Sequence, residues 1–408
     1  MWIIIRLLIG IVILLIVELY FIRHVNLAIK LFFPTFYEKK FHLVRKIFLI
    51  WMNLYPLILI FIFSYFAISG SYLTAPENKI IDYLLIYPFW IFFVLIIQCC
   101  LLFLPLDLIK LFSYMFIKKT RAHLLKIRST LLFLIIGFFI LYIPIRIIYD
   151  YNSVSTRKIE YQKENLPQQL ENFRIAFISD IQADHYTDEA RLQRFVNTVN
   201  SLRPDLILIA GDLITTGPDY IELSGREVGK LKSKYGVYSC VGDHDNWAYR
   251  NDYAKSIAEV EASLYANNVL MVDNGIKSIK VDSAEIEISF ITNTYVQTID
   301  SHILDSLTIK NNGNFKIFLA HQPQQFLIDA AKKNNFDLYL AGHTHGGQIT
   351  FVFPFIQLTP TMFETKYTKG DFWFGDMLLV VTRGLGMSLA PIRYNSTPEV
   401  TLITLKNK

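Results

Sequence analysis

The sequence has few charged residues and few cysteines. Asp, Glu, Lys and Arg make up only 18% of its 408 residues, whereas 53% are hydrophobic. A soluble domain rarely combines so much apolar mass with so little charge, which argues against a purely soluble protein. The three cysteines are a neighbouring pair in an apolar run, Cys99 and Cys100, and a single Cys240. This usage excludes both a disulfide framework and a zinc site built from cysteines.

Acidic residues are especially scarce in the first 150 residues. This part holds 15 Lys and Arg against 6 Asp and Glu, a net charge of +9, while the remainder holds 25 against 29, a net charge of −4. A basic surface for nucleic acid would have to lie on the water-soluble part of the protein. We therefore expect no nucleic-acid partner.

Four apolar runs are long enough to cross a bilayer as helices, since about 20 residues suffice. They cover residues 2–22, 47–69, 83–105 and 131–149. No small-residue cleavage site follows the first run, so we interpret it as a retained anchor rather than a signal peptide. Residues 1–150 are thus predicted to be a four-span transmembrane region. Its polar residues Glu18 and Asn53 are better explained as contacts between helices than as a transport pathway.

The loops between these spans differ in positive charge, which predicts their orientation, because Lys and Arg accumulate in cytoplasmic loops. The second loop has only Lys79. The first and third loops have six basic residues each: Arg23, Lys30, Lys39, Lys40, Arg45 and Lys46 in the first, and Lys110, Lys118, Lys119, Arg121, Lys126 and Arg128 in the third. We predict a multi-pass protein of the cell membrane whose soluble part is extracytoplasmic.

The chain becomes polar after the fourth span. We interpret residues 151–165 as a juxtamembrane connector and residues 166–408 as one soluble domain. Apolar, β-rich runs in this domain predict buried strands over 174–178, 205–209, 236–241, 316–320, 337–340 and 378–382, and helical spacing appears over 189–202 and 252–266. The alternation predicts an α/β fold.

Acidic, amide and imidazole side chains follow five of these predicted strands, where an α/β sheet presents its ligands. A single Asp after a strand is usually a turn residue or a helix cap. Five such strand ends in one domain instead indicate a common site, made by Asp180 and Gln182, Asp212, Asp243 with His244 and Asp245, His321, and His343 with His345.

The mixture of donors predicts a transition-metal site. Carboxylate, imidazole and amide ligands suit Mn²⁺, Fe²⁺ or Zn²⁺, whereas oxygen ligands alone would suggest Mg²⁺ or Ca²⁺. There are too many ligands for one tetrahedral ion. Two ions about 3.5–4 Å apart can clamp a phosphate and activate a hydroxide between them, which indicates phosphoester hydrolysis.

At these residues the sequence resembles the calcineurin-like metallophosphoesterase superfamily. Five segments match its motifs in order: 178–182, 210–213, 241–245, 320–323 and 342–348. The closing segments 382–386, 391–393 and 398–400 resemble the membrane-anchored bacterial branch. The resemblance implies that the four transmembrane helices are followed by an α/β metallophosphoesterase domain of two packed, mixed β-sheets flanked by helices.

The resemblance also implies a role for each site residue. Asp180, Gln182 and His345 would bind a first metal, Asp212 would bridge both metals, and Asp243, His321 and His343 would complete the second. His244 would contact the phosphate and protonate the leaving oxygen, with Asp245 orienting its imidazole. Gln182 stands where the family usually has His, and Asp243 where it usually has Asn.

The resulting hypothesis is a membrane-anchored phosphohydrolase that depends on two divalent metal ions, with manganese among the candidates. It would cleave a phosphoester or pyrophosphate of a small molecule, a lipid or a lipid-linked compound by attack of a metal-bridging hydroxide. The alternative is a non-catalytic metal-binding membrane sensor. Retention of both His244 and Asp245 argues against this sensor.

Three further features have two interpretations each. Arg383 and Arg393 would either contact a substrate phosphate or form structural ion pairs. The apolar segment 351–356 would form either a lip that dips toward the membrane or admits an acyl chain, or a core strand and turn. Asp184 and His185 are either substitute ligands or part of a solvent-exposed loop.

Overall fold

The computed structural model describes residues 2–69, 77–116, 121–309, 315–353 and 356–408. Lys118 and Lys119 of the third loop, and Pro354 and Phe355 of the apolar segment, lie outside the described residues. The chain forms two compact units. We call residues 1–148 with 351–358 the helical unit, and residues 149–350 with 359–408 the sheet unit.

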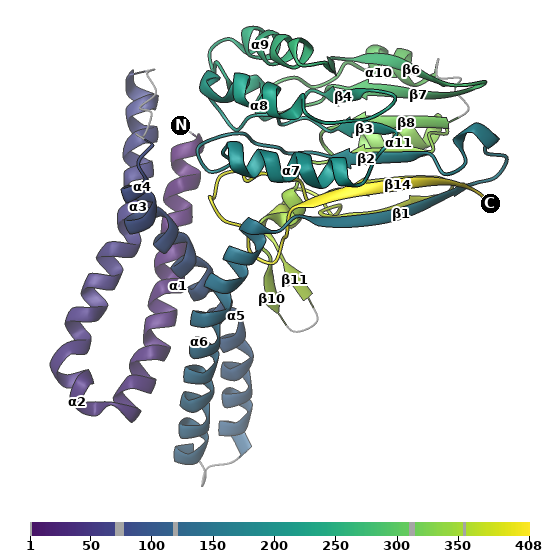
Figure 1. The fold of residues 1–408 in the computed structure, drawn as a ribbon. Coiled ribbons are helices and arrows are strands. Elements are labelled where there is room, and N and C mark those ends of the chain that lie inside the picture. The colour runs from purple at the N-terminus through teal and green to yellow at the C-terminus, as the bar shows by residue number, and fades with distance from the viewer. Residues whose placement is uncertain (1, 70–76, 117–120, 310–314, 354–355) are drawn as a thin grey trace. The chain divides into compact units, whose positions relative to one another are not determined.

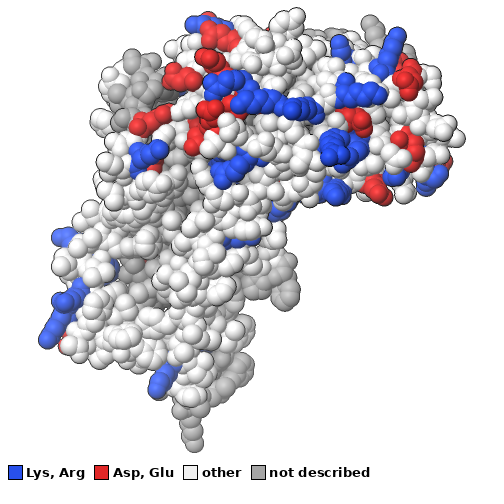
Figure 2. All heavy atoms as spheres, viewed as in Figure 1, with Lys and Arg blue, Asp and Glu red and all other residues white. Residues whose placement is uncertain are grey.

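The helical unit contains four long apolar helices. They are α1 (Trp2–Phe32), α3 (His42–Ser69), α5 (Tyr87–Phe116) and α6 (Arg121–Asn152), with short α2 (Pro34–Phe36) and α4 (Lys79–Ile81) between them. Four segments are long and apolar enough to cross a membrane: Leu8–Phe32, Pro34–Ser69, Lys79–Phe112 and His123–Asn152. Figure 2 shows few charged side chains on these helices, whereas both signs of charge cover the sheet unit.

Buried polar contacts join the helices to one another. Nδ2 of Asn53 in α3 donates a hydrogen bond of 2.9 Å to Oε2 of Glu18 in α1. The contact agrees with the interpretation that these residues pin helices together.

A second, partly buried polar group joins α1, α5 and α6, and no sequence pattern indicates it. Asp107 of α5 accepts a hydrogen bond of 2.8 Å from the hydroxyl of Tyr20 and one of 2.5 Å from Nη2 of Arg128. Its Oδ2 also lies 2.9 Å from Nε2 of His24. Polar groups at membrane depth need such partners, since lipid offers none.

The sheet unit contains two six-stranded sheets (Figure 1). The first has the order β1 (Ser155–Lys163), β14 (Glu399–Asn407), β2 (Arg174–Ile178), β3 (Leu206–Ile209), β4 (Val237–Cys240), β5 (Val269–Val272). The second has the order β12 (Gly370–Phe374), β13 (Met377–Val381), β9 (Leu338–Ala341), β8 (Phe315–Ala320), β7 (Ala284–Ile291), β6 (Gly275–Val281). Both sheets mix parallel and antiparallel pairs.

The two sheets pack face to face around the main core, and helices cover their outer faces. Side chains such as Phe177 of the first sheet and Ile317 of the second share this core. The first sheet is covered by α7 (Glu189–Ser201), α8 (Ile221–Val228) and α9 (Tyr253–Ala266), and the second by α10 (Ser301–Ile309) and α11 (Gln325–Lys333). The predicted α/β fold with two packed mixed sheets flanked by helices is therefore confirmed.

The strands that carry the site lie close to their predicted positions. For example, β2 covers Arg174–Ile178 and β3 covers Leu206–Ile209. Their side chains are almost all buried, because a parallel strand between two neighbours has apolar contacts on both faces.

The stretch interpreted as a connector contains regular structure. Helix α6 continues to Asn152, and Ser155–Lys163 forms β1, which pairs along its whole length with β14. Polar residues alternate in β1 with Ile159 and Tyr161, which pack on the core. The strand lies at the edge of its sheet, where charged side chains are normal and hide the apolar alternation.

The apolar segment after the last metal motif forms a hairpin of β10 (Phe351–Phe353) and β11 (Ile356–Leu358). These strands pair only with each other among the described residues. The hairpin belongs to the helical unit, so the interpretation as a core strand of the soluble domain is wrong.

Candidate metal centre

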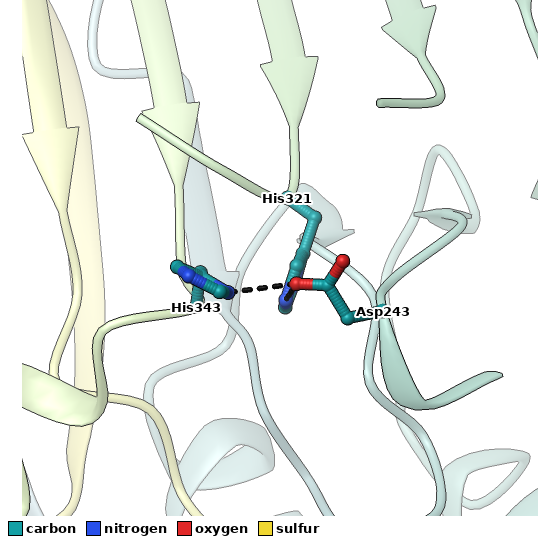
Figure 3. A group of neighbouring side chains, drawn as sticks. All are labelled: Asp243, His321 and His343. Atoms are coloured by element: carbon teal, nitrogen blue, oxygen red, sulfur yellow. Dashed lines mark ion pairs between the residues drawn. The ribbon is translucent and has the colours of Figure 1, made fainter. Parts of the chain in front are cut away.

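The five predicted strand ends meet at one place in the sheet unit. Asp180, Asp212 and Asp243 follow β2, β3 and β4 of the first sheet, while His321 and His343 follow β8 and β9 of the second. The carboxyl ends of these strands lie at the same edge of the two packed sheets, so residues that are far apart in sequence lie close together there. Figure 3 shows Asp243, His321 and His343 converging from three different segments.

The three residues predicted to complete a second metal site form a tight group. Nδ1 of His343 lies 2.8 Å from Oδ2 of Asp243 (Figure 3), and Nε2 of His321 lies 3.3 Å from the same oxygen. One possible ligand atom from each residue lies within 4.8 Å of the others. Such spacing allows one cation to contact all three side chains.

A second group lies beside the first and shares His321 with it. It consists of Asp180, Asp212 and His321, whose possible ligand atoms again lie within 4.8 Å of one another. Nε2 of His321 is 3.3 Å from Oδ2 of Asp212, and Nε2 of His345 is 3.6 Å from Oδ1 of Asp180. The amide of Gln182 donates a hydrogen bond of 2.7 Å to Oδ2 of Asp212. All seven residues predicted as metal ligands are thus brought together.

Three polar atoms in these groups are buried without a hydrogen-bond partner. They are Oδ2 of Asp180, Oε1 of Gln182 and Nε2 of His321. Leaving a buried polar atom unpaired costs about 1–3 kcal/mol, and more when it is charged. All three are lone-pair donors when the imidazole is neutral, so they fit divalent cations as the missing partner.

The backbone is strained at the same residues. Asp180, Gln182, Asp212, His343 and His345 have φ angles of 53°, 52°, 60°, 70° and 50°. Left-handed conformations are unfavourable for residues with a Cβ and cost on the order of 1–3 kcal/mol each. Ten other described non-glycine residues also have positive φ, and six of them are Asn, which tolerates this conformation well. None of the five site residues is Asn, so positive φ at five predicted ligands indicates that the chain places their side chains for a function.

Two glycines let the chain approach the ligands closely. A Cβ on Gly242 would lie 2.2 Å from the backbone nitrogen of Asp212, and one on Gly384 would lie 2.6 Å from Oδ2 of Asp180. Gly384 also has a φ of 62°. Any side chain at either position would displace a carboxylate of the site.

Burial and neighbouring charges shift the pKa values of the imidazoles. Burial lowers the pKa of His345 well below its usual range, and nearby Arg393 acts in the same direction. The ring is therefore neutral and able to act as a ligand. Burial also disfavours charge on His321, but Asp212 and Asp243 outweigh it and raise the pKa of that ring well above its usual value. Without metal, the protonated ring thus compensates the charge of the carboxylates.

His244 is held differently from the sequence-based expectation. Its Nδ1 lies 2.6 Å from the carbonyl oxygen of Thr215, so this nitrogen carries hydrogen and donates. Its Nε2 lies 3.1 Å from the hydroxyl of Ser388. The sequence predicts that Asp245 orients this ring, and this prediction is wrong. The carbonyl oxygen of Thr215 accepts the hydrogen bond from Nδ1 instead.

Asp245 instead organises the loops that carry the ligands. Its carboxylate accepts backbone hydrogen bonds of 3.0, 2.7 and 2.8 Å from Asp212, Leu213 and Gly242. Burial raises its pKa to about 6, and the neighbouring carboxylate of Asp212 adds to this rise. Asp245 therefore supports the backbone at Asp212.

The sequence did not reveal three residues around His343 and Asp243. Glu364 lies 2.8 Å from Nε2 of His343, and the hydroxyl of Tyr295 donates to the same Glu364 oxygen at 2.5 Å. Gln322 donates to both oxygens of Asp243 at 2.9 and 2.8 Å. Gln322 neighbours His321 in a recognised motif, which was a usable signal, whereas no local pattern marks Tyr295 or Glu364.

The contacts of Arg383 and Arg393 favour the structural interpretation over contact with a substrate phosphate. The fully buried guanidinium of Arg393 donates to backbone carbonyls, at 2.8 Å to Gly386, 2.9 Å to Arg383 and 3.0 Å to Ser396. Nε of Arg383 donates to the carboxylate of Glu399 at 2.8 Å. Both arginines hold the chain beside the site.

Asp184 is likewise occupied by local contacts. It accepts hydrogen bonds of 2.8 Å from the backbone of Tyr186 and the hydroxyl of Thr215, and one of 2.7 Å from the backbone of Thr187. His185 packs its ring against Tyr186. These contacts favour a loop over substitute metal ligands, but both residues are half-buried, so the expected solvent exposure of this loop is wrong.

A cavity of about 460 Å³, whose surface is about half polar and half apolar, opens beside His343. Glu364 and Lys366 lie on its wall with several amide and hydroxyl side chains, and Pro323 is its one aliphatic residue. The full lining is Gln322, Pro323, Gln324, Gln325, His343, Glu364, Thr365, Lys366 and Tyr367.

This fold and this group of carboxylates and imidazoles define a metal-dependent phosphoesterase. The family model for calcineurin-like phosphoesterases matches residues 173–347. The metallophosphoesterase YkuE of Bacillus subtilis is 30% identical over 263 residues, which cover 63% of this chain and 87% of that protein. The chain belongs to the calcineurin-like phosphoesterase family and is a metal-dependent phosphoester hydrolase.

Other relatives share the domain. The metallophosphoesterase Cj0846 of Campylobacter jejuni is 25% identical over 317 residues, covering 76% of this chain and 79% of the relative. The transmembrane protein with metallophosphoesterase domain of Danio rerio is 27% identical over 264 residues, covering 61% of this chain and 56% of the relative. Similarity to a transmembrane protein agrees with the apolar helices of this chain.

Proposed function

We propose that the protein hydrolyses phosphoesters with two divalent metal ions. The observation that carries this proposal is the pair of adjacent ligand groups that share His321, together with unpaired buried atoms of Asp180, Gln182 and His321. Asp180, Gln182 and His345 would hold one ion, Asp243, His321 and His343 the other, and Asp212 would contact both. Two such ions supply positive charge for the phosphate and for a water nucleophile.

His244 is the proposed proton donor to the leaving oxygen. Its Nδ1 is committed to the carbonyl of Thr215, which leaves Nε2 to carry the transferable proton. Ser388 contacts Nε2 and would hold the ring in place until the substrate arrives. The backbone nitrogen of His244 also donates to Oδ1 of Asp212 at 2.8 Å, so the donor and the bridging carboxylate are positioned together.

The donor set favours Mn²⁺, Fe²⁺ or Zn²⁺ over Mg²⁺ and Ca²⁺. Three imidazoles, from His321, His343 and His345, stand among the proposed ligands, and imidazole suits transition metals. The neutral amide of Gln182 makes the first ion the more weakly held. The extra negative charge of Asp243 strengthens binding of the second ion.

The substrate is proposed to be a phosphoester or pyrophosphate with a hydrophilic leaving group. The amide and charged side chains in the wall of the cavity beside His343, such as Gln324 and Glu364, support this choice, because they offer donors and acceptors to hydroxyl-bearing groups. The apolar helices support a lipid or lipid-linked compound as the other part of the substrate. The net charge of −4 in the soluble part argues against nucleic acid. The distribution of basic loops supports an extracytoplasmic site.

Purification of the full-length protein in detergent allows this proposal to be tested. Metal content would be measured together with hydrolysis of an aryl phosphate, a phospholipid and an acylated sugar nucleotide in Mn²⁺. We expect two bound ions per chain and hydrolysis of a substrate with a polar leaving group. One ion per chain would contradict the two-metal proposal. Bound metal without hydrolysis of any substrate would instead support a metal-binding membrane sensor.

A further inference from the structure

Two hydrogen bonds attach the hairpin of β10 and β11 to helix α5. Figure 1 shows where these elements lie in the fold. Nε2 of Gln98 in α5 donates to the carbonyl oxygen of Val352 at 2.7 Å. The backbone nitrogen of Val352 donates to Oε1 of Gln98 at 2.9 Å. One side-chain amide thus satisfies both backbone groups of Val352, as a neighbouring strand would.

The position of Val352 in the hairpin explains why it needs such a partner. Val352 lies opposite Gln357, between the pairs Phe351–Leu358 and Phe353–Ile356. In an antiparallel pair, alternate residues direct their N–H and C=O groups away from the partner strand. Val352 is such a residue, and Gln98 covers the edge that it would otherwise leave open.

Gln98 lies deep within an apolar helix. Residues 89–97 before it and 99–106 after it contain no charged side chain. At 1.5 Å per residue, about 12–14 Å of apolar helix extends on each side, whereas the hydrocarbon core of a bilayer is about 30 Å thick. The side chain of Gln98 is fully buried. Its partner Val352 therefore lies at the depth of the hydrocarbon.

Backbone groups at this depth must be paired within the protein, because an unpaired group in hydrocarbon costs several kcal/mol. An open strand edge is excluded there for the same reason. The amide of Gln98 removes the open edge of β10. A glutamine in the middle of an apolar span, which is costly by itself, is explained by this requirement.

We propose that the β10–β11 hairpin is embedded in the membrane and contacts lipid hydrocarbon. Val352 and Ile356 are 46% and 52% exposed, and Gln357 is the one polar residue among the six described residues of the hairpin. The exposed side chains of α5, to which the hairpin is attached, include Phe92, Leu104 and Leu108 and are apolar in the same way. Lipid chains are therefore the partner that fits these side chains, and this inference does not depend on the proposed catalytic mechanism.

Cysteine labelling in membranes tests this proposal. Val352→Cys and Ile356→Cys would be introduced singly into the full-length protein, with Tyr265→Cys, at a position that is 73% exposed in α9, as the water-exposed control. The three native cysteines are buried, so the unaltered protein gives the background. In open membrane fragments, a charged maleimide should label the two hairpin variants at least tenfold more slowly than the control, and SDS should abolish the difference.

A second measurement separates lipid from protein as the covering partner. A photoactivatable phospholipid with its reactive group in the acyl chain should cross-link to the peptide that contains β10 and β11. Labelling of the hairpin within twofold of Tyr265→Cys would overturn the proposal. Slow labelling without a lipid cross-link would also overturn it, because the hairpin would then be covered by another protein surface.

The role of Gln98 is tested by Gln98→Leu in the Val352→Cys background. Loss of both hydrogen bonds should release the edge of β10 and raise maleimide labelling several-fold, with a matching loss of lipid cross-linking. Gln357→Leu makes the same chemical change on the other strand and should leave labelling within twofold. Equal labelling of Gln98→Leu and its parent would contradict the proposed attachment.

Discussion

Nε2 of His343 lies 2.8 Å from Oε1 of Glu364, and Nδ1 of the same ring lies 2.8 Å from Oδ2 of Asp243. A carboxylate on one imidazole nitrogen fixes the orientation of the ring and makes the other nitrogen a better ligand. Glu364 is therefore a positioning residue for a proposed metal ligand. Tyr295 donates to the same carboxylate and keeps it in place.

Glu364→Ala should weaken binding of the second metal by roughly 10–100-fold, the usual effect of losing such an outer partner. Glu364→Gln should recover part of the loss, because its amide oxygen can still accept the hydrogen bond. Metal titration of the purified protein measures this effect. Glu222→Ala, a change of an exposed residue in α8, is the matched control. An unchanged affinity in Glu364→Ala would show that other contacts orient the ring.

Asp212→Asn should be the most damaging single change to metal binding. Its carboxylate is the proposed contact of both ions and lies 3.3 Å from His321. Asparagine keeps the shape but removes the negative charge, so metal content and hydrolysis should fall together, by more than the roughly 10–100-fold typical of outer partners. Elemental analysis and rate measurements test this. Asp219→Asn, at an exposed position, should change neither quantity. Full metal content in Asp212→Asn would refute the bridging role.

His244→Ala should separate proton transfer from metal binding. The proposed ligands remain, so metal content should be preserved, while the rate for a substrate with a poor leaving group should fall by roughly 10² to 10⁴. The rate of hydrolysis of an aryl phosphate should fall much less, because its leaving oxygen is a weak base and needs no proton. Rates for both substrates and the bound metal would be measured on one preparation. If both rates and the metal are lost together, His244 is a ligand.

Asp107→Asn should destabilise the helical unit. The change leaves Arg128, which is 6% exposed, without its charged partner. Removing one member of a fully buried ion pair typically costs about 3–5 kcal/mol, and the loss should be smaller here because the side chain of Asp107 is 33% exposed. The midpoint of thermal unfolding in detergent should therefore fall clearly. The double variant Asp107→Asn with Arg128→Met should recover much of the loss, and a double variant no more stable than Asp107→Asn would argue that the pair contributes little.

The loops with many basic residues predict that residues 151–408 lie outside the cytoplasm. A reporter that is active only in an oxidising compartment should therefore function when fused after Lys408. A reporter that requires the cytoplasm should be inactive at the same position. The reverse pattern would overturn the predicted orientation and would point to a substrate in the cytoplasmic leaflet.

Much of the fold could be predicted because it depends on short-range patterns. The apolar run of β3 and the helical spacing of α7 each indicate their own secondary structure. Asp212 could be placed at a strand end because it directly follows such a run. The position of β1 was missed, since an edge strand carries charges that mask its apolar alternation.

The partners of the site residues could not be predicted in this way. Glu364 is separated from His343 by 21 positions, and Tyr295 from His343 by 48. Neither lies in a pattern that distinguishes it from other loop residues. The role of Asp245 was also mispredicted, because two of its three hydrogen-bond partners come from a distant part of the chain. Its carboxylate accepts hydrogen bonds from backbone N–H groups and does not hydrogen-bond to the ring of His244.

The sequence by itself determined that long apolar helices precede an α/β domain and that acids and imidazoles follow its strands, because periodicity and strand-end position are local properties. The tertiary structure decided which of these side chains meet. It places Glu364 beside His343 and lets Arg393 donate hydrogen bonds to backbone carbonyls. It also pairs the backbone of Val352 with Gln98, which is far away in sequence. Such contacts depend on how the sheets and helices pack, and packing is set by the summed burial of the whole chain rather than by any short segment.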